Sequence, residues 1–233
     1  DSGQSRSRPH PGEMNLFGHL LDLLLPCRCV ICRSTGLALC QNCAGQLTPS
    51  ARAVTRFDLH GWASSDYGTS EKVLIKAFKE DGITALAPIL ARLMKPAFQC
   101  LLDEMPTQID DVWLVPAPSS QANFRKRGYL PSLILARQLN RATGRSLTVK
   151  AALRFGRSVA DQSGLSVEQR SSNLVGSMVS SAAASGRRVI LIDDVVTTGA
   201  TLVEAARAIA EAGGEVVGFL TFSETILKTH AKI

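Results

Sequence analysis

Apolar residues fall into short runs and periodic stretches that alternate along the chain. Residues 189–192 form an apolar run without alternation, which predicts a central parallel strand buried on both faces. Residues 202–209 carry apolar side chains at helical spacing, and Gly213 follows as a helix stop. Upstream, 112–116 predicts a short strand and 130–144 a helix. This order is typical of an α/β fold with an open parallel sheet.

The stretch between the first cysteines and this region contains three more predicted elements. Residues 62–67 predict a strand, and 73–78 show the spacing of an apolar helix face. Residues 85–102 are apolar over most of a helical surface, which predicts a buried helix.

The first 26 residues differ from the rest. Residues 1–13 are polar and contain proline, which predicts a disordered tail. The following apolar run ends at a proline and is too short for a membrane span. Because polar residues interrupt it and no small-residue cleavage site follows, it predicts an amphipathic helix and not a signal peptide. We therefore expect a cytoplasmic protein without membrane insertion, divided into 14–60 (N-terminal helix and cysteine module) and 61–233 (main domain).

The overall composition is ordinary, but the positive charge is unevenly distributed along the chain. The 233 residues are 45% hydrophobic and 20% charged, as in ordinary globular proteins, and the formal net charge is +6. Residues 119–160 contain nine basic residues and no acidic one, so the remainder of the chain carries about −3. This concentration of positive charge predicts an anionic ligand near that segment, although some of these arginines suit ordinary solvated helix positions.

Five cysteines lie close together near the N-terminus. Cys29 and Cys32 form one C-x2-C pair, and Cys40 and Cys43 form a second after seven intervening residues. This is metal-ligand spacing, and four thiolates favour a structural Zn²⁺. Disulfides and small buried residues are the alternatives, and a reducing cytosol disfavours the first. Cys27 is a fifth thiol that could replace Cys29.

The most distinctive stretch is VILIDDVVTTGAT, residues 189–201. A strand, a tight turn and a helix place the backbone N–H groups of 197–201 at a helix N-terminus, which favours a phosphate. Asp193 and Asp194 would repel that phosphate, so they more plausibly accept hydrogen bonds from hydroxyls of the same ligand. A sugar phosphate has both groups. A P-loop, a D-x-D phosphatase motif and a Gly-rich dinucleotide motif are all missing from the sequence.

A second candidate binding segment is the turn 116–120, where the predicted strand ends in prolines and serines. Ligands of open parallel sheets lie beyond the carboxyl ends of strands, so this turn is placed to contact one. A turn that only connects the strand to the next element, without binding a ligand, is nearly as consistent with the residues alone.

VILIDDVVTTGAT resembles the 5-phosphoribosyl-1-pyrophosphate (PRPP) motif of type I phosphoribosyltransferases. The order of four-cysteine knuckle, LIKAFKEDG, VPAP, RKRGY, DQSGL and RSSNL is similar to the ComF (competence protein F) family over nearly all residues after Met14. The resemblance implies a type I phosphoribosyltransferase (Rossmann-like) α/β fold, with a central mostly parallel sheet flanked by helices and a small N-terminal zinc-binding module. The ComF family is phosphoribosyltransferase-like and is linked in competent bacteria to uptake of single-stranded DNA.

The resemblance also implies roles for individual residues. Asp193 and Asp194 would hold the ribose hydroxyls as catalytic residues, and the turn after them would bind the 5′-phosphate. Residues 158–169 would form a flexible lid, and Mg²⁺ would bridge pyrophosphate and ribose oxygens. The complete PRPP-binding set implied is Lys79, Pro118, Ser119, Arg125, Arg127, Asp193, Asp194, Val195, Val196, Thr197, Thr198, Gly199, Ala200 and Thr201.

Two positions depart from the family pattern. Leu130 follows the R-G-aromatic triplet, where the family usually has Asn and sometimes Asp, and Ala117 replaces the valine of P-V-P. If the usual Asn contacts the acceptor substrate or helps to close the loop, Leu130 puts that function in doubt for this protein.

Two functions remain open at this stage. One is transfer of phosphoribosyl from PRPP-Mg²⁺ to an unknown acceptor, a pentosyl (glycosyltransferase) reaction that releases pyrophosphate. The other is a non-catalytic competence protein that keeps a ribose 5-phosphate site and assists uptake of single-stranded DNA with a ComF-operon helicase. Aromatic residues make up only 5% of the chain, which argues mildly against base stacking. Homo-oligomerisation is left open by the sequence.

Overall fold

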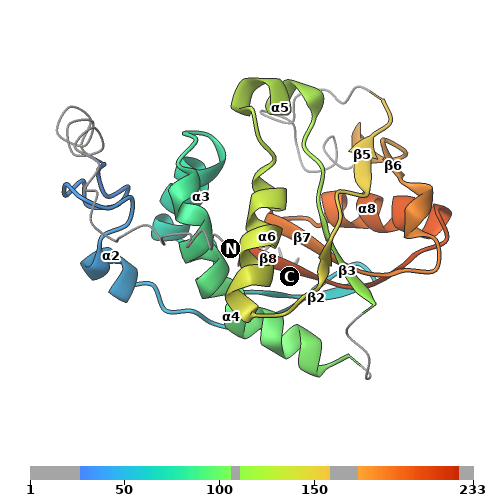
Figure 1. Ribbon diagram of the computed structural model, residues 1–233, viewed down its shortest axis with the longest axis horizontal. Helices are drawn as coiled ribbons and strands as arrows, with labels where there is room; N and C mark the ends of the chain where they lie inside the picture. The colour runs from blue at the N-terminus through green and yellow to red at the C-terminus, as the bar shows by residue number, and fades with distance from the viewer. Residues whose placement is uncertain (1–26, 106–110, 158–172, 226–233) are drawn as a thin grey trace, which may run out of the picture.

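The structure, a computed structural model, describes residues 27–105, 111–157 and 173–225 (Figure 1). The predicted tail 1–13, the helix that follows it and the segment 158–169 expected to form a lid lie outside the described residues.

A six-stranded sheet organises the described part of the chain. Its order is β1-β2-β8-β7-β3-β4, and every neighbouring pair is parallel except β1–β2. The mostly parallel sheet predicted from the sequence is therefore confirmed. The strands are β1 (Arg52–Arg56), β2 (Leu59–Ala63), β3 (Val112–Pro116), β4 (Thr148–Val149), β7 (Arg188–Val196) and β8 (Glu215–Glu224).

Helices cover both faces of the sheet. α4 (Ala87–Asp103) packs on β2 and β8, α6 (Pro131–Thr143) packs on β3 and β7, and α3 (Thr69–Lys79) shares their apolar core. α8 (Ala200–Glu211) covers the other face and also contacts the hairpin of β5 (Leu153–Phe155) and β6 (Met178–Ser180). The short helix α5 (Gln121–Arg127) has no buried residue and stands at the top of the view in Figure 1.

Strand β7 is buried on both faces, as predicted. Ile190 and Ile192 pack with α3, α4 and α6, whereas Val189 and Leu191 pack with α8. Successive side chains alternate between faces, so the pleat directs Asp194 toward α3. The two carboxylates lie at the carboxyl end of this central strand.

The sheet begins earlier in the sequence than expected. β1 and β2 form a hairpin whose second strand pairs with β8, so the sheet starts at Arg52 and not after residue 60. The cysteine module, which includes α2 (Gln41–Gly45), packs onto the same core: Cys29, Leu39 and Cys43 are buried in the cluster that contains α3 and α4.

Residues Thr84–Asp103 are long and apolar enough, by length and composition alone, to span a membrane. Within the described residues this segment is instead a core element, because eight residues of α4 are buried and the helix packs on α6 and β8. The predicted buried helix is confirmed, and cytoplasmic location stays a prediction.

Candidate functional site

A buried ion pair stands at the carboxyl end of β7. Lys79, the last residue of α3, places Nζ 2.8 Å from Oδ2 and 3.1 Å from Oδ1 of Asp194. The Asp194 side chain is 4% exposed, and that of Lys79 is 36% exposed. Asp193 accepts a hydrogen bond from the N–H of Asp194 at 2.8 Å. One carboxylate is therefore neutralised by a lysine, while the other lacks such a partner among the described residues.

The two carboxylates consequently differ in acidity. Burial, and then the charge of Asp194, raise the pKa of Asp193 to about 7. Burial also opposes ionisation of Asp194, but the Lys79 ammonium outweighs it and holds the pKa of Asp194 below its usual range. In turn, the Asp194 carboxylate raises the pKa of Lys79. At neutral pH the site thus holds one firmly ionised carboxylate and one that titrates.

The turn after β7 has the geometry of a phosphate site. Gly199 has φ +85°, and helix α8 begins directly after it without a side-chain cap. No hydrogen bond in the described part of the chain engages the N–H groups of Thr198 and Gly199. Leu174, Asp193 and residues 195–202 line a hollow of about 60 Å³. Free N–H donors and the positive end of the α8 dipole make this hollow suitable for an anion.

A larger cleft of about 240 Å³ opens from the same residues toward β3 and α5. Its walls are the turn after β3, the cationic side chains of Lys79 and Arg127, and both aspartates. Ser120 caps α5 by accepting from the N–H of Asn123 at 3.2 Å, and Ser132 donates to the carbonyl of Ala117 at 2.6 Å. These bonds fix the turn 117–120 against two helices.

A third cavity, of about 300 Å³, lies on the α3 side of the aspartates. Tyr67, Ile75, Lys76 and Glu80 line it together with Lys79 and the end of β7. All three cavities share Asp193 and Thr201, so they are branches of one cleft centred on the end of β7.

The structure brings together all but one of the residues that the sequence suggested for PRPP. Lys79, Pro118, Ser119 and Arg127 line the cleft with both aspartates, and Val195–Thr201 line the hollow. Arg125 is exposed on α5 and lines none of the three cavities. The place of Arg125 in the predicted PRPP-binding set therefore has no support from this geometry.

Several contributing residues were not expected from the sequence. Asn123 and Phe155 line the cleft, and the Tyr129 hydroxyl donates to the carbonyl of Phe78. Tyr129 belongs to the RGY triplet, and its hydrogen bond fixes the end of α3. Lys79 is the last residue of that helix, and its side chain extends from there to Asp194. The triplet was visible in the sequence, but this partner was not.

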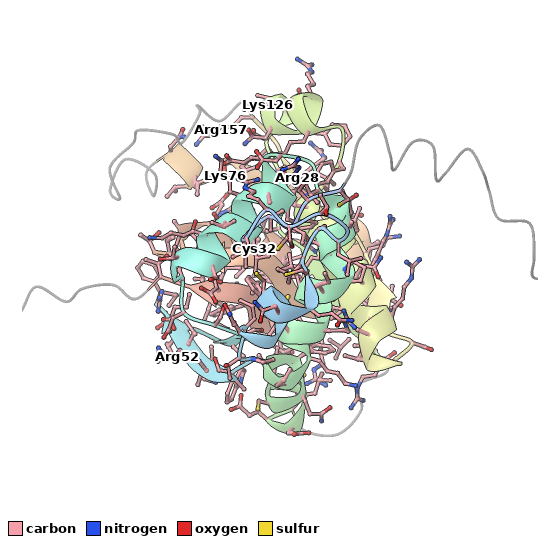
Figure 2. The ribbon with its side chains drawn as sticks, turned by 90° about the vertical axis from the view of Figure 1, so that its left-hand side faces the viewer. Arg28, Cys32, Arg52, Lys76, Lys126 and Arg157 are labelled. Atoms are coloured by element: carbon pink, nitrogen blue, oxygen red, sulfur yellow. The ribbon has the colours of Figure 1, made fainter. Side chains whose placement is uncertain are left out.

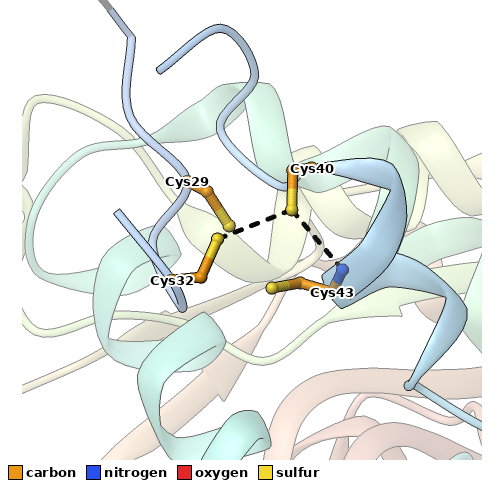
Figure 3. Close-up of side chains that lie close together, drawn as sticks. All are labelled: Cys29, Cys32, Cys40 and Cys43. Carbon is orange, nitrogen blue, oxygen red and sulfur yellow. Dashed lines mark hydrogen bonds between the residues drawn. The ribbon is translucent and has the colours of Figure 1, made fainter. Parts of the chain in front are cut away.

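The four predicted metal ligands meet in one place (Figure 3). The Sγ atoms of Cys29, Cys32, Cys40 and Cys43 lie within 4.8 Å of one another, and Cys32 and Cys40 are 3.6 Å apart. A tetrahedral Zn–S4 centre with bonds of about 2.3 Å requires S–S distances of about 3.8 Å. Four cysteines at this spacing can bind a structural metal, whereas Cys27 is exposed and outside the cluster.

The thiols of this cluster have unequal acidities. Burial disfavours the Cys29 thiolate, but nearby backbone N–H groups outweigh this and lower the pKa of Cys29 to about 6. Burial, followed by its cysteine neighbours, raises the pKa of Cys43 to about 12. A divalent cation would offset both the burial and the neighbouring thiols that keep Cys43 protonated.

A comparison with known protein families identifies part of the main domain. The family described as phosphoribosyl transferase domain matches residues 125–231, which include the β7 motif and α8. The chain contains a phosphoribosyl transferase domain. The relationship predicted from the motif is thereby confirmed.

The chain is also similar to individual proteins and solved structures. DNA utilization protein YhgH of Escherichia coli K12 is 28% identical over 178 residues, covering 76% of this chain and 74% of that protein. An orotate phosphoribosyltransferase of Pyrobaculum calidifontis is 50% identical over 44 residues, but these span only 19% of this chain and 23% of that enzyme. Among solved structures, an adenine phosphoribosyltransferase of Thermoanaerobacter pseudethanolicus aligns over 75% of this chain and 83% of its own, with 16% identity and a TM-score of 0.33.

Proposed function

We propose that the protein binds PRPP-Mg²⁺ in the branched cleft and transfers its phosphoribosyl group to an acceptor. One observation carries this proposal: a carboxylate pair lies between an N–H-lined hollow and a cationic cleft. A ribose bearing a 5′-phosphate and a 1-pyrophosphate has complementary groups in that order. The hollow would take the 5′-phosphate, the aspartates the ribose hydroxyls, and the wider cleft the pyrophosphate.

Lys79 has a more specific role in this proposal than charge neutralisation of pyrophosphate. Its ammonium is already paired with Asp194, so its first effect is to keep that carboxylate ionised and oriented. Arg127 and the hydroxyls of Ser119 and Ser120 remain to bind the leaving pyrophosphate. They would stabilise the negative charge that develops as the bond from ribose C1 to pyrophosphate breaks.

The magnesium ion would arrive with PRPP. Mg²⁺ retains waters and prefers hard oxygen ligands. This cleft offers hydroxyls and the carboxyl group of Asp193, which has no cationic partner within the described residues, and this fits an ion that arrives with its ligand. When bound, the ion would neutralise pyrophosphate charge. The acceptor would reach ribose C1 from the third cavity, which adjoins the aspartates from the α3 side.

Calorimetric titration with PRPP, with and without Mg²⁺, tests this proposal. We expect magnesium-dependent binding that the double variant Asp193→Asn, Asp194→Asn abolishes, because both ribose acceptors lose their charge. Asp111→Asn is the matched control, since this exposed residue precedes the amino end of β3. Equal PRPP affinity of the wild type and the double variant would show that the aspartates do not hold the ribose.

The second candidate is a non-catalytic protein that assists DNA uptake with a helicase partner. The similarity to the DNA utilization protein over most of the chain favours it, as do the exposed basic side chains of α5, with Lys126 at the top of Figure 2. A single-stranded oligonucleotide in the same titration separates the candidates. Contacts with many phosphates lose affinity steeply with salt, and binding of this kind without PRPP binding would favour the second candidate.

The cysteine cluster would hold a structural Zn²⁺ in either case. All four positions of a tetrahedral centre would be filled by thiolates, so no site would remain for a reacting water.

A further inference from the structure

Arg56, the last residue of β1, holds the turn that follows β7. Its Nε donates to the carbonyl oxygen of Thr197 at 2.8 Å. Its Nη2 donates to Glu224 Oε1 at 2.8 Å and to the carbonyl of Thr225 at 3.2 Å, and Nη1 donates to the carbonyl of Thr55 at 3.0 Å. One guanidinium therefore joins β1, the end of β8 and the turn 197–199.

The Arg56–Glu224 pair is largely sheltered from water, whereas the bond from Arg56 to the Thr197 carbonyl is exposed. The side chains of Arg56 and Glu224 are 10% and 12% exposed. Arg52, on the same strand, pairs with Asp66 at 2.7 Å, but those side chains are 43% and 54% exposed. Arg52 lies at the lower left of the molecule in Figure 2, away from Lys126. Charge-assisted hydrogen bonds are stronger when they are buried, whereas exposed ion pairs contribute little to stability.

The bond to Thr197 determines how the next N–H group points. The peptide between Thr197 and Thr198 is trans, as are all peptides of the described residues, so its C=O and N–H point in opposite directions. Because the carbonyl faces Arg56, the N–H of Thr198 faces away from it. The hollow of about 60 Å³ is lined by Thr197, Thr198 and Gly199 but not by Arg56.

The aliphatic part of Arg56 fixes the turn at a second point. A Cβ on Gly199 would lie 2.6 Å from Arg56 Cβ and 3.0 Å from its Cγ. The arginine stem therefore packs directly on the backbone of Gly199, which has φ +85°. Together, the guanidinium and the stem restrain two consecutive residues of the turn.

We propose that Arg56 is a positioning residue for phosphate binding, which orients the N–H of Thr198 toward the ligand without touching it. This inference rests on the proposed function, because it takes the hollow to be the 5′-phosphate site. The charge of Arg56 is balanced by Glu224, so its effect on the phosphate comes through the orientation of the turn more than through direct attraction.

Two ligands that occupy different ends of the cleft separate positioning from general damage. We would titrate ribose 5-phosphate and, separately, Mg²⁺-pyrophosphate into the wild type and the variants Arg56→Ala, Arg56→Lys and Arg52→Ala. Arg56→Ala should weaken ribose 5-phosphate binding about tenfold, which corresponds to one oriented hydrogen bond. Arg56→Lys should lose part of that affinity, because an ammonium lacks the planar fork that reaches Thr197 and Glu224 together. Pyrophosphate affinity should stay within about twofold, and Arg52→Ala should change neither.

Each other outcome contradicts a defined claim. If the wild type does not bind ribose 5-phosphate, the proposed function fails and the role of Arg56 fails with it. If the wild type binds it and folded Arg56→Ala binds it equally well, only the positioning role is overturned. An equal loss for both ligands would mean general structural damage and would also overturn the role. If Arg56→Ala does not fold, wild-type affinity of Arg56→Lys for ribose 5-phosphate decides against the proposal.

Discussion

At the scale of single residues, Asp193 should make ligand binding depend on pH near neutrality. Its raised pKa, about 7, means that the folded protein holds this proton more tightly than the unfolded chain. This group therefore lowers stability as pH rises from about 4 to 7. Ribose hydroxyls donate best to the ionised form, so PRPP affinity should rise about tenfold between pH 6 and pH 8.

Titration calorimetry across this pH range measures the effect. The phosphates of PRPP also lose a proton near pH 6, so Asp193→Asn is the control that retains the dependence of the ligand alone. A flatter pH profile in Asp193→Asn is the expected result. Identical slopes in the two proteins would assign the whole dependence to the ligand.

The residues of the candidate site differ in how far the sequence could reveal them. Asp193, Asp194 and the turn 197–201 are contiguous, so strand, carboxylates and helix start appear together in thirteen letters. The contacts of Arg56 with Thr197 and Glu224 span 141 and 168 positions, and no local pattern indicates them. Tertiary pairing alone brings that arginine to the site.

At the scale of elements, helix α6 lacks a side-chain cap at its first turn, because Leu130 occupies the capping position. Leu130 occupies the N-cap position with extended φ and ψ (−105° and 106°), and no side chain caps the helix. Asn at this position can accept from the free N–H groups of the first turn, which contributes about 1 kcal/mol. Leu130→Asn should therefore raise the free energy of unfolding by about 1 kcal/mol in urea titrations.

Leu130→Ala is the matched control, because it removes the leucine without adding an acceptor. Leu130 lines none of the three cavities, so PRPP affinity should not change in either variant. If Leu130→Asn is no more stable than Leu130→Ala, helix capping does not explain the Asn that the family resemblance implies at this position.

Elements were predictable where the apolar pattern was long. α4, α6 and α8 each bury five or more residues, and their periodicity indicated them. β1 was missed because it is an edge strand in which only Val54 is buried, so no run or clear alternation marks it. The domain boundary expected after residue 60 consequently falls inside the β1–β2 hairpin.

At the scale of the whole molecule, the cysteine module and the cleft share one core. Cys29 and Cys43 are buried in the cluster that also contains Leu74 and Phe78 of α3. Because α3 ends at Lys79, loss of a metal from the module should disturb the cleft as well as the module. Chelation should lower the melting temperature by about 5 °C or more and weaken PRPP binding.

Metal analysis, thermal melting and PRPP titration of Cys32→Ser and Cys27→Ser test this coupling. Cys32→Ser removes one of four clustered thiols and should lose zinc, whereas Cys27→Ser should retain one zinc per chain, because Cys27 is exposed outside the cluster. Zinc loss in Cys27→Ser would show that Cys27 is needed for zinc binding, and the proposed set of four ligands would be wrong. Wild-type PRPP affinity in zinc-free Cys32→Ser would show that the module and the cleft are energetically independent, although they share a packed core.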